Sequence, residues 1–225
     1  MEAPVMAAGA CSGKVASQSQ LFARRTDERD VRLTRVLVAD DEHLVAAGIS
    51  SSLTGLGYTV VGTVGDGLEA IELCRRDPPD LALLDVRMPN CNGLEAAAVV
   101  FRELHVPVVI LSAYSDPEYV STATQAGVFG FLLKPASQDQ IRVCLEIAWG
   151  RFQAHLRQDE EIAALKRRLE DRKTIEQAKW LIVKHKQVSE PQAMKLLQKQ
   201  ARDTRRPLVD IARSILENMT LLVAE

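Results

Sequence analysis

The sequence predicts an α/β domain built on a doubly wound, five-stranded parallel sheet, followed by an all-α part with an extended helix and a three-helix bundle. Between residues 34 and 150, five short apolar runs alternate with helix-length amphipathic stretches. Because these runs are apolar at successive positions, they are typical of strands buried on both faces, as in a parallel sheet. Beyond residue 150, apolar residues recur every three or four positions, which is the period of a helix.

The elements of the α/β domain can be placed from this alternation. The strands are expected near residues 35–39, 58–63, 80–84, 107–111 and 128–133. The helices are expected near residues 43–56, 67–76, 93–104, 117–126 and 137–149. Pro107 opens one expected strand and Gly127 precedes another, at positions where proline and glycine commonly begin or end an element. Right-handed crossovers through these helices place helices on both faces of the sheet.

Composition divides the 225 residues into three parts. Residues 1–33 show no sustained period and are expected to be a disordered extension. Residues 34–150 form the α/β domain, in which segment 34–136 carries 6 Lys/Arg against 13 Asp/Glu, a net charge of −7. Residues 151–225 form the helical part, in which segment 172–213 carries 11 Lys/Arg against 4 Asp/Glu, a net charge of +7. A basic domain favours an anionic partner.

An apolar seam at helical spacing runs from the last helix of the α/β domain into the helical part: Ile141, Leu145, Ala148, Phe152, Ile162, Leu165 and Leu169. The seam predicts one long amphipathic helix that pairs with a second copy of the chain; the alternative is a helix packed on its own domain. His155 and Asp159 interrupt the seam, so a continuous coiled coil is not expected. Two shorter helices are expected to begin near Ser189 and Pro207.

Several classes of protein are not expected. The four cysteines, at positions 11, 74, 91 and 144, form no CxxC pair, which argues against a disulfide framework or a zinc site. Isolated thiols suit a reducing cytoplasm, which is the expected location. No apolar run approaches the roughly 18 residues of a membrane span, so no membrane partner is expected. The N-terminus lacks the basic region and apolar core of a secretory signal.

Polar residues follow four of the expected strands and should meet at one edge of the sheet. They are Asp40 and Asp41, Asp85, Ser112 and Lys134. The carboxyl ends of parallel strands share an edge, and this edge carries the ligand site in open α/β sheets. Three adjacent carboxylates repel one another unless a cation lies between them, and carboxylate oxygens favour Mg²⁺. An aspartate can attack phosphorus, while a lysine and a hydroxyl can hold phosphoryl oxygens.

In pattern and order, residues 35–150 resemble a response-regulator receiver domain with a flavodoxin-like fold. The matching motifs are Asp40-Asp41, Asp85-Val86-Arg87-Met88-Pro89 with Gly93, Ser112-Ala113, and Lys134-Pro135. The resemblance implies that Asp85 is the phosphoacceptor. It also implies that Mg²⁺ is bound by Asp41, Asp85 and the backbone carbonyl of Arg87, with Asp40 acting through water. Ser112, Ala113 and Lys134 would sense the phosphoryl group, Phe131 would be the switch aromatic, and Lys134-Pro135 is often a cis bond in the family.

Residues 158–218 resemble the ANTAR domain, a three-helix RNA-binding output of antitermination regulators. The resemblance rests on Leu165-x-x-x-Leu169, Arg172-x-x-Ile175-x-x-Ala178-Lys179, Val188-Ser189-Glu190-x-x-Ala193-x-x-Leu196-Leu197, Ala201 and Ile211-Ala212. Many relatives carry glycine after Ala-Lys, where this chain has Trp180. Such a ring is more often part of a small core, although an exposed ring can stack on a base.

The basic residues of this part and Trp180 are the candidates for RNA contact, because cations hold phosphates while loop bases can stack on a ring. The candidates are Lys179, Trp180, Lys184, Lys186, Lys195, Lys199, Arg202, Arg205, Arg206 and Arg213. The leading hypothesis is a phosphorylation-controlled regulator rather than an enzyme, whose only chemistry is Mg²⁺-dependent self-phosphorylation. Its expected partners are a sensor histidine kinase, RNA hairpins and a second copy of the chain once phosphorylated.

Three alternatives remain beside this hypothesis. The helical part could bind a protein partner as an adaptor, in which case no salt-sensitive RNA binding is expected. It could be a DNA-binding helix-turn-helix, although no glycine follows Gly150 and residues 208–211 offer few base-reading groups. The acidic pocket could turn over a phosphorylated metabolite, but no substrate cleft or general acid is evident. A haloacid-dehalogenase type of site would require Asp-x-Asp after the first strand, which this chain lacks.

Overall fold

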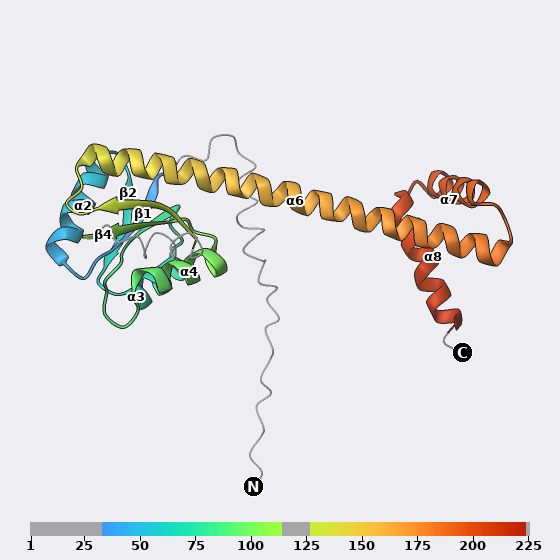
Figure 1. The fold of residues 1–225 in the computed structure, drawn as a ribbon, viewed down its shortest axis with the longest axis horizontal. Coiled ribbons are helices and arrows are strands. Elements are labelled where there is room, and N and C mark those ends of the chain that lie inside the picture. The colour runs from blue at the N-terminus through green and yellow to red at the C-terminus, as the bar shows by residue number, and fades with distance from the viewer. Residues whose placement is uncertain (1–32, 114–126, 224–225) are drawn as a thin grey trace, which may run out of the picture. The chain divides into compact units, whose positions relative to one another are not determined.

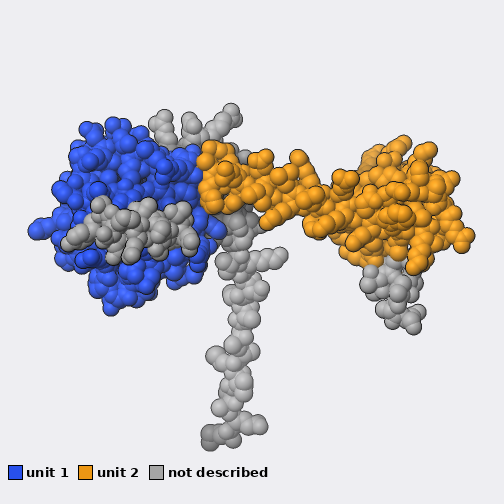
Figure 2. Space-filling view, in the orientation of Figure 1, with its two compact units in different colours: residues 1–153 blue, residues 154–225 orange. Residues whose placement is uncertain are grey.

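The computed structural model describes residues 33–113 and 127–223, with the side chains of 219–223 left aside (Figure 1). The chain divides into two compact units, the first ending at Gln153 and the second beginning at Ala154 (Figure 2). The helix expected at residues 117–126 and nearly all of the expected extension at 1–33 lie outside the described residues. In the part of the chain that the structure describes, no helix is long and apolar enough to cross a membrane.

The first unit contains the expected five-stranded parallel sheet. Its strands are β1 (Arg35–Ala39), β2 (Thr59–Val64), β3 (Leu81–Asp85), β4 (Val108–Ser112) and β5 (Val128–Leu133). They lie in the order β2-β1-β3-β4-β5, which is doubly wound because the chain reverses direction across the sheet after β2. Every residue of β3 and β4 is buried, as the continuous apolar runs predict for central strands.

Helices cover both faces of this sheet (Figure 1). On one face, α3 (Gly67–Arg76) and α4 (Gly93–Leu104) pack on Leu37, Leu84 and Ile110. On the other, α2 (His43–Gly55) and the first part of α6 (Gln138–Lys186) pack on Val38, Leu83 and similar residues. Alternate side chains of each strand therefore enter opposite cores, and each fully buried leucine or isoleucine contributes roughly 1.5–3 kcal/mol to stability.

Helix α6 is a single helix of 49 residues, so the last helix of the α/β domain does run on into the helical part. The first four seam residues, Ile141, Leu145, Ala148 and Phe152, are buried against the first unit. Beyond them Ile162, Leu165 and Leu169 are each about half exposed. The apolar seam expected from the sequence is therefore divided into two parts. Its first part is buried in the first unit, and its second part is exposed to solvent.

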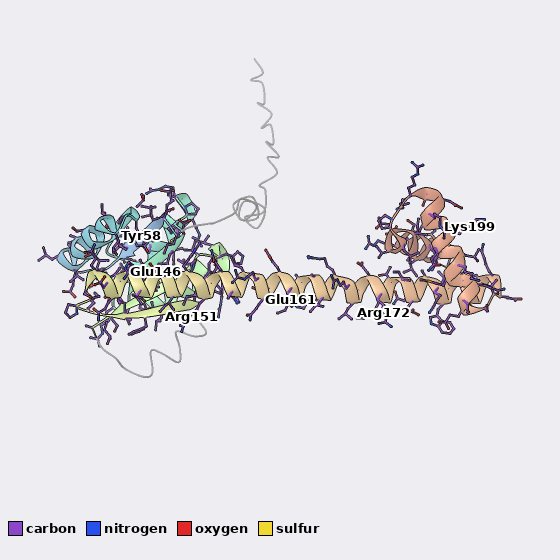
Figure 3. The ribbon with its side chains drawn as sticks, turned by 90° about the horizontal axis from the view of Figure 1, so that it is seen from above. Tyr58, Glu146, Arg151, Glu161, Arg172 and Lys199 are labelled. Carbon is purple, nitrogen blue, oxygen red and sulfur yellow. The ribbon has the colours of Figure 1, made fainter. Side chains whose placement is uncertain are left out.

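Aromatic and backbone contacts fasten α6 to β5. The ring of Phe152 meets Phe129 edge to face at 5.4 Å between centroids and lies 5.7 Å from Trp149. Phe129 in turn meets Phe101 of α4 at 5.3 Å. Nη1 of Arg151, labelled in Figure 3, donates a hydrogen bond to the Phe129 carbonyl at 3.4 Å. Because edge-to-face aromatic pairs add to the stability from burial, Phe152 anchors this part of α6 on β5.

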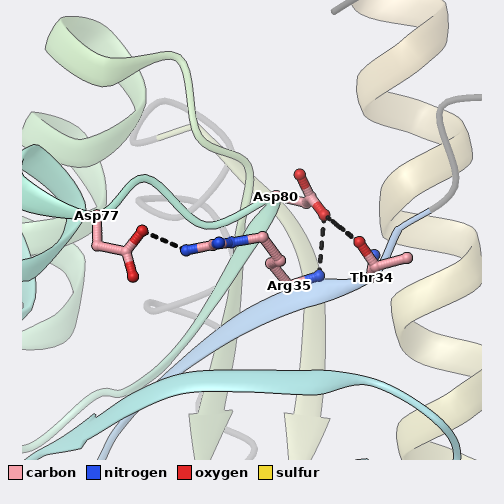
Figure 4. A network of polar contacts seen from close by, with 4 residues as sticks. All are labelled: Thr34, Arg35, Asp77 and Asp80. Carbon is pink, nitrogen blue, oxygen red and sulfur yellow. Dashed lines mark hydrogen bonds and ion pairs between the residues drawn. The ribbon is translucent and has the colours of Figure 1, made fainter.

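A polar network closes the N-terminal edge of the sheet, opposite the acidic edge (Figure 4). Oδ2 of Asp80 accepts hydrogen bonds from the backbone N–H and Oγ1 of Thr34, at 3.0 and 3.1 Å, and from the N–H of Arg35 at 2.9 Å. The guanidinium of Arg35 also forms an ion pair with Asp77. These contacts tie the start of β1 to the segment before β3 and help set their register.

The second unit is a bundle of the C-terminal half of α6 with α7 (Glu190–Thr204) and α8 (Leu208–Val223). Its core consists of Ala178, Leu197, Ile211 and Ala212. The expected helix starts are present, since Ser189 caps α7 and Pro207 immediately precedes α8. Oε1 of Gln192 accepts hydrogen bonds from the N–H and the Oγ of Ser189, at 2.9 and 3.0 Å.

Candidate functional site

The carboxyl edge of the sheet gathers the polar residues that the sequence placed at strand ends. Asp40 follows β1, Asp85 ends β3, Ser112 ends β4, and Lys134 follows β5. One carboxylate oxygen from each of Asp40, Asp41 and Asp85 lies within 4.8 Å of the other two. Residues separated by almost a hundred positions in sequence thus form one site, because parallel strands end at the same edge.

Lys134 neutralises two of these carboxylates. Its Nζ lies 2.6 Å from Oδ2 of Asp40 and 3.0 Å from Oδ1 of Asp85. The other oxygen of Asp40, which is fully buried, accepts a hydrogen bond of 3.0 Å from the N–H of Glu42. Since a buried carboxylate is stable only when its charge is compensated, Lys134 and this N–H hold Asp40 in place.

Burial and charge act in opposite directions on the two groups in contact. Burial raises the pKa of Asp85 and the neighbouring charge of Asp40 adds to the rise, while Lys134 and the N–H of Arg87 lower it in part. Burial lowers the pKa of Lys134, but its hydrogen bonds to Asp40 and Asp85 outweigh that effect and the pKa is raised. Lys134 therefore stays charged at neutral pH and stabilises the ionised form of Asp85.

The three carboxylates fit a hard divalent cation. Asp41 is exposed, whereas Asp40 and Asp85 are buried, so the cluster opens to solvent on the side of Asp41. A cavity of about 530 Å³ adjoins it and is lined by Asp41, by Val86 to Pro89 and by part of α4. Carboxylate oxygens, a backbone carbonyl and remaining waters are the ligands that Mg²⁺ prefers. The donor set and the solvent-open side are consistent with a magnesium ion that also contacts a phosphoryl group.

The remaining pocket residues lie around this cluster. Ser112 is buried at the end of β4, and its carbonyl accepts a hydrogen bond of 2.8 Å from the N–H of Lys134. Ala113 is exposed beside it. Phe131, half-buried on β5, packs against the core under α3 and α4, and the Lys134-Pro135 bond is cis.

In the helical unit, Lys179 differs from the other basic candidates. It is only 7% exposed, and its Nζ lies 2.5 Å from a carboxylate oxygen of Glu176 and 2.5 Å from one of Glu190. These two partners raise the pKa of Lys179. The ammonium joins α6 to the first turn of α7 and does not face solvent, because two carboxylates enclose it.

The other basic candidates are exposed. They are Lys184, Lys186, Lys195, Lys199, Arg202, Arg205, Arg206 and Arg213, of which Lys199 is labelled in Figure 3. Arg213 is paired with Asp210 at 3.5 Å, and Arg206 donates to Oγ of Ser214 at 3.5 Å. Trp180 is 58% exposed, so the ring that was expected to fill the small core lies largely at the surface.

Comparison with known proteins assigns both units. The receiver domain family of response regulators matches residues 36–146, and the ANTAR domain family matches residues 163–216. The transcriptional regulatory protein PdtaR of Mycobacterium tuberculosis is 37% identical over 185 residues, which cover 82% of this chain and 90% of PdtaR. This chain is a response regulator. It has an N-terminal receiver domain and a C-terminal ANTAR domain, and it is a phosphorylation-controlled regulator with an RNA-binding, antitermination output.

Other relatives match the receiver domain of this response regulator. The probable transcriptional regulatory protein NarL of Mycobacterium tuberculosis is 42% identical over 120 residues, which cover 52% of this chain and 56% of NarL. Among solved structures, the receiver domain of a modulated diguanylate cyclase from Desulfovibrio desulfuricans G20 superposes with a TM-score of 0.52 at 30% identity. It covers 55% of this chain and 99% of that receiver domain, which agrees with the flavodoxin-like topology of the first unit.

The response regulator also has a supporting network that the motif residues do not include. Asp66 accepts hydrogen bonds from the N–H of Leu68, at 2.6 Å, and from Nδ2 of Asn90, at 2.5 Å. This pair holds the loop that follows Asp85 against the start of α3. At Gly93 a Cβ atom would lie 1.9 Å from the Asp85 carbonyl, so only glycine fits there. The Asp66-Gly67 pair is typical of a helix start, and this signal in the sequence could have located the hydrogen bond from the Leu68 N–H to Asp66.

Proposed function

We propose that Asp85 of this response regulator accepts a phosphoryl group from the phosphohistidine of a sensor kinase. Mg²⁺ would be held by Asp41, Asp85 and the backbone carbonyl of Arg87, with Asp40 acting through water. The observation that supports the proposal best is the bridge from Lys134 to Asp40 and Asp85 at 2.6 and 3.0 Å. It places a fixed cation beside the carboxylate that would carry the phosphoryl group, as phosphoryl transfer requires.

The transfer itself needs little covalent chemistry from the protein. A carboxylate oxygen of Asp85 attacks phosphorus, the bond from phosphorus to the kinase imidazole nitrogen breaks, and that nitrogen retains the electron pair. A bound Mg²⁺ supplies charge neutralisation for the phosphoryl oxygens. Lys134 stays charged, as its raised pKa allows, and pairs with one phosphoryl oxygen. The hydroxyl of Ser112 and the backbone at Ala113 bind another phosphoryl oxygen. Ser112 would move to make this contact, and the Phe131 ring would change position in response.

The new charge would then bias the output. We propose that phosphorylation favours a dimer in which the half-exposed Ile162, Leu165 and Leu169 of two copies pack together. Two ANTAR domains would present their exposed cations to paired RNA hairpins near a terminator.

Free thiols at Cys74, Cys91 and Cys144 are consistent with a cytoplasmic location.

Labelling with acetyl phosphate and Mg²⁺ tests the phosphoacceptor. Asp85→Asn is expected to lose the covalent label, because an amide oxygen is a far weaker nucleophile than a carboxylate. Asp77→Asn, a matched change at the opposite edge of the sheet, is expected to label as the wild type does. Undiminished labelling of Asp85→Asn would reject the assignment, and mass spectrometry of the labelled peptide would identify the residue used instead.

A further inference from the structure

A cavity lies within the ANTAR unit, between the end of α6, the C-terminal half of α7 and α8. It has a volume of about 450 Å³, inside the range of roughly 300–1,000 Å³ typical of small-molecule sites. Leu181, Ile182, Leu196 and Ile215 form its apolar part. Leu196 is 39% exposed although the core residue Leu197 next to it is fully buried, so the apolar part is open to solvent.

The polar lining of this cavity contains two lysines, one aspartate, one glutamine and one histidine, His185. Lys186 stands on α6, and Lys199, Gln200 and Asp203 follow one another along one side of α7. Within the described part of the chain, no ion pair joins either lysine to a carboxylate. These cations are therefore available for an anionic partner, in contrast to Lys179, which two carboxylates enclose.

We propose that this cavity binds one unstacked base of an RNA hairpin loop, and that Asp203 selects guanine. The inference rests on the proposed RNA-binding output and assigns the place where sequence is read. An apolar floor suits the face of a base, and the two lysines suit the flanking phosphates. The same arrangement places an acceptor and an amide at the edge of the cavity, where the base edge would lie.

The choice of guanine follows from hydrogen-bond donors and acceptors. The carboxylate of Asp203 accepts hydrogen bonds and donates none, and guanine presents two adjacent donors, N1–H and the N2 amino group. Adenine and cytosine each place a ring acceptor beside their amino donor, and uracil flanks its single N3–H with two carbonyl oxygens. Each of these acceptors would repel the carboxylate. The amide of Gln200 can both donate and accept hydrogen bonds, so it can pair with a polar group of the base that Asp203 leaves unpaired.

A second copy of the chain is a less suitable occupant. The segment 172–213 carries a net charge of +7, so placing this surface against its own copy brings like charges together. RNA instead brings phosphates to Lys186 and Lys199 while inserting an uncharged base into the apolar part. Charge complementarity therefore favours the RNA loop.

The experiment uses the full chain and a pool of hairpin RNAs with a fixed stem and a randomised loop. Bound hairpins are sequenced, and affinities for the preferred hairpin and its single-base replacements are measured by fluorescence anisotropy. The wild type is expected to enrich guanine at one loop position and to lose about 10-fold in affinity when that guanine becomes adenine. Asp203→Asn is expected to remove most of this preference, because an amide offers both a donor and an acceptor and can pair with adenine as well as with guanine.

Two further variants complete the test. Glu217→Gln removes the same charge on α8, outside the cavity lining, and is expected to keep the guanine preference. Leu196→Trp fills the cavity without changing charge and is expected to abolish base discrimination while salt-dependent binding persists. Circular dichroism verifies that each variant is folded.

The outcomes separate the two proposals. If the wild type binds no hairpin, the RNA-binding proposal fails and this inference fails with it. If the wild type binds but Asp203→Asn and Leu196→Trp keep the same loop preference, only the assignment of the cavity is overturned. Light scattering that shows loss of dimers in Leu196→Trp, with RNA preference unchanged, would assign the cavity to an interface between copies instead.

Discussion

Replacing Phe152 with alanine should destabilise the first unit severely. The ring is 1% exposed and makes an edge-to-face contact with Phe129, so its loss removes buried area, leaves a cavity and abolishes an aromatic pair. Such a change costs about 3–5 kcal/mol in unfolding free energy. Phe152→Leu keeps most of the volume and should cost only about 1–1.5 kcal/mol.

Urea unfolding followed by Trp149 fluorescence measures this effect, because that indole lies 5.7 Å from Phe152. A Trp180→Phe background removes the signal of the helical unit, so that the transition reports the first unit alone. Ile147→Ala is the matched control, since Ile147 lies on the same helix but is 51% exposed, and it should cost about 0.5 kcal/mol or less. If Phe152→Ala and Ile147→Ala unfold at the same urea concentration, Phe152 does not anchor α6.

Two further predictions concern the network in Figure 4 and a buried thiol. Asp80→Ala removes the acceptor of three hydrogen bonds and should lower the unfolding free energy by about 1–3 kcal/mol, whereas Asp80→Asn should lose less; equal losses would contradict the network. Burial raises the pKa of Cys74 from 9.0 to about 12, so iodoacetamide at pH 8 should spare Cys74 in the folded chain and modify it in urea. The raised pKa of Cys74 also contributes to the stability of the folded state below pH 9, and this contribution is lost as the pH rises to about 12. Alkylation of folded Cys74 at the rate of an unfolded peptide would refute the predicted protection and the predicted pH dependence.

The sequence predicted the sheet well because glycine, proline and apolar runs are local signals. The strands near 80–84 and 107–111 each lie one residue further along, so Asp85 and Ser112 are the last residues of β3 and β4 rather than the first residues after them. The reason is that neighbouring strands extend the ladder by one residue, as the hydrogen bond from the Val86 N–H to the Leu111 carbonyl shows. The meeting of the three carboxylates was predictable because it depends on topology alone.

Contacts across turns were not predictable. Lys179 was counted among the RNA candidates because its partner Glu190 lies 11 positions away on another helix. The i,i+3 pair with Glu176 was visible in the sequence, but an exposed pair of that kind contributes little and does not indicate burial. The division of the apolar seam of α6 into a buried and an exposed part was not predictable either. Periodicity locates an apolar face of a helix but does not show which other residues cover it.

The enclosure of Lys179 changes how much charge the ANTAR unit offers to a polyanion. Binding to single-stranded RNA displaces condensed counterions, and the logarithm of affinity falls with the logarithm of salt by about 0.7 for each phosphate neutralised. An ammonium already held at 2.5 Å by two carboxylates displaces none, so Lys179 contributes to the net charge of the segment but not to this slope. The salt dependence of RNA binding therefore counts the cations that reach a phosphate, and the enclosed Lys179 is not expected to be one of them.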